Sequence, residues 1–138
     1  MARLEQVLKG IKSVQAKGPK RIPRLPITPN HLVKMKEVWD KLPNTFDGKM
    51  LWVASSLCFF GFLRSGEITI PSDSSYDKGA HLNYEDIAVD RLHCPRVLKV
   101  RLKASKSNPF RMGVDIFVGK TGNQLCPVTA VLSYMKNR

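Results

Sequence analysis

The feature that most constrains the fold of this chain is a long apolar stretch near its middle. Residues 50–63 read MLWVASSLCFFGFL and include two hydroxyl side chains, those of Ser55 and Ser56. The stretch is 14 residues long, whereas a helix needs about 20 apolar residues to cross a bilayer. Its apolar positions run almost all round a helix, which is typical of a helix buried in a protein core. We therefore predict a central core helix over residues 47–63, capped by Asp47, and no membrane span.

A second helix is predicted just before it. Thr28 stands where an N-cap is expected, and Pro29 suits the first helical position, where a missing N–H costs nothing. Apolar residues follow at helical spacing up to Leu42, and Pro43 ends the pattern. A further short helix is predicted to begin at Cys126 and Pro127 near the end of the chain.

The period of the sequence changes in the second half. In residues 97–103, VLKVRLK, apolar and basic side chains alternate after Val97. In residues 112–118 the apolar residues Met112, Val114, Ile116 and Val118 likewise recur at every second position. This period of two predicts a β-hairpin, because successive strand residues face opposite sides. Ile87 and Val89 suggest a third strand. With 138 residues, the chain is expected to form one α+β domain, mostly helical around a small antiparallel sheet.

The charge of the chain points to a polyanionic partner. Lys and Arg number 23 against 11 Asp and Glu, a formal net charge of +12. Residues 1–24 carry seven basic side chains and one acid, and residues 96–111 carry six and none. We interpret residues 1–24 as a basic helical arm and residues 25–138 as the folded domain. The alternatives are a solvated linker and a solvated sheet face. The candidate DNA-binding residues are Lys17, Lys20, Arg21, Arg24, Lys99, Arg101, Lys103 and Arg111.

Cysteine and histidine usage indicates no metal or redox site. The three cysteines are scattered without a CxxC pair, and the three histidines lack metal-ligand spacing. No glycine-rich phosphate loop is present. We expect no metal and no small-molecule cofactor. The N-terminal residues lack a signal-peptide core, so we expect a nuclear or cytoplasmic protein that is not secreted.

Two motifs resemble those of the tyrosine recombinase (phage integrase) family. The first is CFFGFLRSGEI, residues 58–68, which resembles the segment that carries the family's first catalytic arginine. The second is LKASKSNPFRMGVDIFV, residues 102–118, which resembles the β-hairpin that carries its catalytic lysine. The sequences of both motifs most resemble those of recombinases from DIRS-like and Crypton-like transposable elements. The resemblance implies catalytic roles for Arg64 and Lys106, with Lys103 as the fallback, and an integrase-like catalytic core.

The resemblance implies DNA breakage and rejoining through a phosphotyrosine, with double-stranded DNA as partner. The family also requires a His-x-x-Arg motif and a nucleophilic tyrosine on helices that follow the hairpin. No histidine lies beyond His93, so that motif does not follow the hairpin here. Tyr134 comes too early for that role, and we expect it to serve packing. The chain is accordingly expected to be a truncated catalytic core, incomplete as an enzyme.

The alternatives are a non-catalytic DNA-binding remnant or adaptor and, ranked last, a basic RNA-binding module. The RNA reading ranks last because only Phe110 and Phe117 supply aromatic rings near the hairpin. A truncated core would leave apolar side chains of the central helix exposed, and we therefore expect self-association. The side chains expected to be exposed are those of Leu51, Leu57, Phe60 and Phe62.

Overall fold

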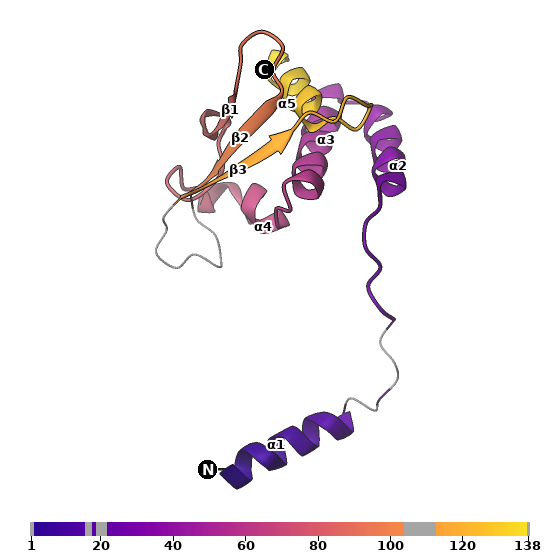
Figure 1. Ribbon diagram of the computed structural model, residues 1–138, viewed down its shortest axis with the longest axis vertical. Helices are drawn as coiled ribbons and strands as arrows, with labels where there is room; N and C mark the ends of the chain where they lie inside the picture. The colour runs from indigo at the N-terminus through magenta and orange to yellow at the C-terminus, as the bar shows by residue number, and fades with distance from the viewer. Residues whose placement is uncertain (1, 16–17, 19–21, 104–112, 138) are drawn as a thin grey trace.

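The computed structural model describes residues 2–15, 18, 22–103 and 113–137. Helices and a small antiparallel sheet occur together (Figure 1), which confirms the α+β class. The helices are α1 (Ala2–Gln15), α2 (Pro29–Asp40), α3 (Thr45–Phe60), α4 (Ser65–Ile68) and α5 (Pro127–Lys136). Two 3-10 turns, η1 (Asp73–Ser75) and η2 (Tyr84–Asp86), precede the strands β1 (Ile87–Val89), β2 (Val97–Leu102) and β3 (Val114–Gly119).

The helix starts follow the local sequence, with one correction. Thr28 is the N-cap of α2 and Pro29 its first residue, as predicted. The prediction that Asp47 caps the central helix is wrong, because the cap is Asn44, whose Oδ1 accepts the N–H of Phe46 at 3.0 Å. Asp47 lies in the first turn instead, where a carboxylate is favourable near the positive end of the helix dipole.

The central helix α3 packs between α2 and α5. A Cβ atom at Gly48 would lie 2.3 Å from the carbonyl oxygen of Trp39, so only glycine permits this close approach of α2 and α3. From α3 the core continues into α5, where Val128 and Val131 are each 1% exposed. The apolar stretch thus forms a core helix as far as Phe60, whereas the predicted helix extended to residue 63. No helix among the described residues is long and apolar enough to cross a membrane.

The sheet has the order β1-β2-β3, and both pairs are antiparallel. Leu98, Val100 and Leu102 are buried against the helices, whereas Lys99 and Arg101 are exposed on the other face. The predicted antiparallel strand pair and third strand are confirmed, with different bounds: β2 ends at Leu102 rather than residue 103, and β3 spans Val114–Gly119 rather than 112–118. The alternating sequence thus places cations on the open face of the sheet.

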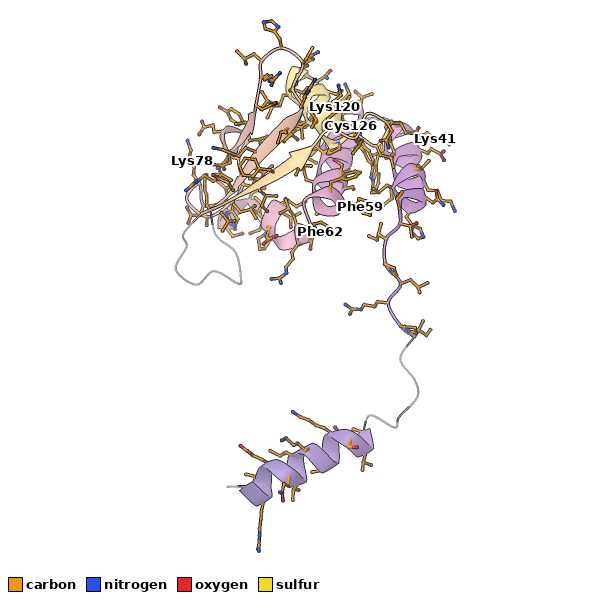
Figure 2. All side chains as sticks on the ribbon, viewed as in Figure 1. Lys41, Phe59, Phe62, Lys78, Lys120 and Cys126 are labelled. Atoms are coloured by element: carbon orange, nitrogen blue, oxygen red, sulfur yellow. The ribbon has the colours of Figure 1, made fainter. Side chains whose placement is uncertain are left out.

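The expected exposure of the central helix is wrong for one of its four side chains. Leu57 is 2% exposed, because α3 is covered on both sides, by α2 and by α5. Leu51 and Phe60 are half-buried. Phe62, which follows the helix, is 91% exposed, as expected, and Figure 2 shows it at the edge of the core.

Candidate nucleic-acid interface

Arg64 stands on a short turn that joins α3 to α4. The turn starts at Gly61, whose N–H donates to the carbonyl of Leu57 at 2.9 Å. A Cβ atom at Gly61 would lie 2.8 Å from that carbonyl oxygen, so the turn needs a glycine. The next residues alternate between solvent and core: Phe62 is exposed, Leu63 is 7% exposed, and Arg64 is exposed. The buried Leu63 thereby anchors the segment and directs Arg64 to the surface.

The acid next to Arg64 is used by the backbone. The Oε2 atom of Glu67 accepts the backbone N–H of Arg64 at 2.8 Å and so caps α4. Within the part of the chain that the structure describes, the guanidinium of Arg64 has no ion pair. The charge of Glu67 also adds to burial in raising the pKa of the Cys58 thiol. The capping bond therefore leaves the guanidinium available for an anion.

Lys106, the other candidate catalytic residue, lies outside the described residues. Lys103, the fallback candidate, lies within them. The Nζ atom of Lys103 lies 2.9 Å from the Oδ2 atom of Asp86 and donates to the carbonyl of Lys78 at 2.7 Å. The side chains of this pair are 22% exposed for Lys103 and 10% for Asp86. Lys103 thus ties the end of β2 to η2, and its charge is neutralised within the protein.

Helix α4, which follows Arg64, and the turn η2, which holds Lys103, line a common hollow. Ile68 of α4 lines the same hollow as Asn83 and Tyr84, and η2 ends at Asp86, the partner of Lys103. In the view of Figure 1, α4 and the hairpin end of the sheet lie towards the same side of the core. The fold therefore places α4, which Arg64 precedes, on the same side of the core as the end of β2.

The cations on the open sheet face share one acid. Arg101 and Asp115 are directly paired across β2 and β3, and Nη1 lies 3.2 Å from Oδ1. Lys99 reaches the other oxygen of Asp115 at 3.9 Å. Residues 96–111 contain no acid, but strand pairing brings Asp115 to two of their cations. The open face of the sheet is therefore less positive than its sequence suggests.

Phe117 is a surface residue that the sequence analysis undervalued. It is directly opposite Lys99 in the ladder and is 66% exposed. An aromatic ring beside cations is a feature of surfaces that stack nucleobases. The alternation of β3 contained the signal, since Phe117 falls between the inward positions Ile116 and Val118.

A second acid near the sheet also serves the backbone. The carboxylate of Asp90 accepts the N–H groups of Arg96 and Val97 at 2.9 and 3.1 Å. These bonds lower the pKa of Asp90, with a smaller contribution from the charge of Arg91. Asp90 is therefore ionised at neutral pH and holds the start of β2.

The remaining candidate residues are less informative. Lys17, Lys20, Arg21 and Arg111 lie outside the described residues, and Arg24 is exposed in the extended segment 22–28. Tyr134 belongs to α5 and packs against Phe46 of α3, with the two ring centroids 5.2 Å apart. The described residues contain no group of three or more metal-ligating side chains.

The comparisons with known proteins add no relative. No protein-family model, curated protein or solved structure matches this chain.

Proposed function

We propose that this chain is a DNA-binding protein of the tyrosine recombinase kind, in which Arg64 holds a phosphate of the duplex backbone. One observation carries the proposal. The only carboxylate beside Arg64 in its turn, that of Glu67, is bonded to the backbone N–H of Arg64, and the guanidinium is exposed. The net charge of +12 supports a polyanionic partner.

The chemistry of these residue types suits a phosphodiester. A guanidinium presents several N–H donors in one plane and can bind two non-bridging oxygens of a phosphate at once. In the proposed role, Arg64 stabilises the charge that develops on those oxygens during phosphoryl transfer. Lys106, which lies between β2 and β3 in the sequence, would give a proton to the leaving 5′-oxygen.

We propose that the chain binds DNA without cleaving it, as an incomplete recombinase or an adaptor. The proposal is supported by the position of Tyr134, which is half-buried against Phe46 rather than presented beside Arg64. Incubation with duplex DNA should therefore give no covalent adduct on a denaturing gel. An adduct that disappears in Tyr134→Phe would contradict this part of the proposal. A nuclear location fits a duplex partner.

Binding to duplex DNA is tested by fluorescence anisotropy at several salt concentrations. Each phosphate that a cation neutralises releases counterions, so log Kd should rise by about 0.9 per log unit of salt for each contact. We expect tight binding at low salt and a steep loss as salt increases. Absence of binding at low salt, or affinity that does not change with salt, would overturn the proposal.

A second candidate function is favoured by Phe117. Its exposed ring opposite Lys99 suits a stacked nucleobase of a single strand, as in an RNA-binding module. In that case Phe117→Ala should weaken binding of single-stranded oligonucleotides about tenfold, and Arg64→Ala should have a smaller effect. Equal affinity of wild type and Phe117→Ala for single strands would exclude this candidate.

A further inference from the structure

The segment between η1 and η2 forms a turn that is closed by a histidine ring. The N–H groups of Ala80 and His81 both donate to the carbonyl of Asp77, at 3.1 and 2.9 Å. The Nδ1 atom of His81 in turn accepts the backbone N–H of Asp77 at 2.8 Å. The ring also stacks on that of Tyr76, with the centroids 5.9 Å apart. The imidazole of His81 therefore joins the two ends of residues 76–81, which we call the His81 turn.

The His81 turn also holds the ammonium group of Lys103. The Nζ atom of Lys103 donates to the carbonyl of Lys78, which lies inside the turn (Figure 2), at 2.7 Å. The second partner of Nζ, the carboxylate of Asp86, comes from η2. Asn83 links the turn to η2, because its backbone N–H donates to Asp86 at 2.7 Å and its side-chain amide donates to the carbonyl of His81 at 3.2 Å. The turn and η2 together therefore keep Lys103 mostly buried.

The hydrogen bond between Asp77 and His81 depends on the charge of the ring. An imidazole nitrogen accepts a hydrogen bond only when it carries no proton, so the closed turn contains the neutral ring with its proton on Nε2. A protonated ring is a donor at both nitrogens and cannot accept the N–H of Asp77. Histidine is the side chain whose charge ordinarily changes between about pH 5 and pH 8. Lowering the pH through this range therefore favours an open turn.

The acids around the His81 turn do not favour a proton on the ring. The carboxylate of Asp77 accepts the N–H of Gly79 at 2.8 Å. Glu85 and Asp86 of η2 each form an ion pair with a lysine, and Asp73 of η1 is exposed to solvent. A protonated ring would have to compete for the bonded carboxylates with their present partners. The titratable groups of the turn and of the elements beside it are Asp73, Tyr76, Asp77, Lys78, Tyr84, Glu85, Asp86 and Lys103.

We propose that the His81 turn is a pH-sensitive device that controls the exposure of Lys103. When His81 is neutral, the turn is closed and the carbonyl of Lys78 binds the ammonium group. When His81 is protonated, the turn opens and Lys103 loses one of its two partners. Its ammonium group then becomes available to an anion at the end of β2. The device is independent of the proposed DNA binding, because it concerns the protein alone, and each can fail without the other.

Nitrogen NMR of the full chain with isotope-labelled histidine tests the state of the ring. The signal of His81 is assigned by its absence from the spectrum of His81→Asn. At about pH 8 it should show the neutral tautomer with the proton on Nε2, because Nδ1 accepts the N–H of Asp77 in the closed turn. A proton on Nδ1 of His81 at this pH would contradict the proposal.

Chemical labelling with an amine-acylating reagent, read by mass spectrometry, measures the release of Lys103. Lys120 is exposed and serves as the reference amine in the same sample, so the ratio of the two labelled fractions removes the effect of pH on the reagent. We expect the ratio of Lys103 to Lys120 labelling to rise about fivefold from about pH 8 to about pH 5. This is the factor that corresponds to the loss of one hydrogen bond from the closed turn.

Three variants separate the His81 turn from a general effect of pH. His81→Asn offers an amide oxygen in place of Nδ1 and does not titrate, so its labelling ratio should stay low at both pH values. His81→Ala has no acceptor, and its ratio should be high at both. His93→Asn removes a histidine that is exposed between β1 and β2, and this matched control should respond like the wild type. A wild-type ratio that does not change with pH, an equal rise in His81→Asn, or loss of the rise in His93→Asn would overturn the proposal.

Discussion

The turn around Arg64 and the open face of the sheet treat their cations in opposite ways. At the turn, the neighbouring acid Glu67 bonds to a backbone N–H and leaves the guanidinium exposed. On the sheet, Asp115 lies within ion-pair distance of both Lys99 and Arg101. At the end of β2, Asp86 neutralises Lys103. The turn has fewer basic residues than the sheet, but its cation, Arg64, has no carboxylate partner among the described residues.

This contrast shows why a count of basic residues overestimates a binding surface. An exposed cation that already has a carboxylate partner must give up that interaction before it binds a phosphate. Surface ion pairs contribute only about 0–1 kcal/mol, so the cations of the sheet can still bind, but with a smaller net gain. Arg64 has no such partner among the described residues. We expect it to contribute more to affinity than Lys99 or Arg101.

The largest predicted effect concerns the pair at the base of the hairpin. Asp86→Ala removes the partner of the mostly buried Lys103 and the acceptor for the N–H of Asn83, which lies at 2.7 Å. We expect a loss of about 2–3 kcal/mol in the free energy of unfolding, because a buried charge is left unpaired. Urea denaturation measures it. A loss of only about 0–1 kcal/mol in the free energy of unfolding, as for an exposed ion pair, would show that the pairing of Lys103 with Asp86 does not stabilise the fold.

The second prediction concerns the cap that leaves Arg64 exposed. Glu67→Ala removes the acceptor for the backbone N–H of Arg64 and should cost about 1 kcal/mol, as losses of helix caps do. Glu67→Gln keeps an acceptor oxygen and should restore most of the stability. Thermal melting of the two variants makes the comparison, and equal melting temperatures would mean that the bond does not hold the turn.

The third prediction concerns the acid on the sheet. Asp115→Asn releases Lys99 and Arg101, and we expect duplex DNA to bind about threefold more tightly at low salt, with stability changed by less than about 1 kcal/mol. The gain should shrink as salt rises. Anisotropy titrations at two salt concentrations test this, and unchanged affinity would indicate that the sheet face does not contact DNA.

The sequence predicted much of the fold because its signals are local. The apolar stretch, the Thr28 and Pro29 start and the alternation of β2 each depend on neighbouring residues, and the structure confirms them. The cap of α3 was misassigned because Asn44 and Asp47 are both capping residue types and stand three positions apart.

The state of the candidate site could not be predicted in the same way. The partners of the cations come from other elements: Asp115 from β3 and Asp86 from η2. The burial of Leu57 likewise depends on α2 and α5, which are distant from it in sequence. Only the position of Arg64 at the surface follows from a local pattern, in which Leu63 points inward and its neighbours point outward.

The most direct test compares two arginines in one binding assay. Duplex DNA affinity is measured by anisotropy for the wild type, Arg64→Ala and Arg101→Ala, with Lys41→Ala as a control for loss of one exposed charge distant from Phe62 and the turn (Figure 2). We expect Arg64→Ala to weaken binding about tenfold or more, as loss of a charge-assisted phosphate contact does, and Arg101→Ala to weaken it about twofold to threefold. Equal losses in Arg64→Ala, Arg101→Ala and Lys41→Ala would contradict the account, because binding would then depend on net charge alone.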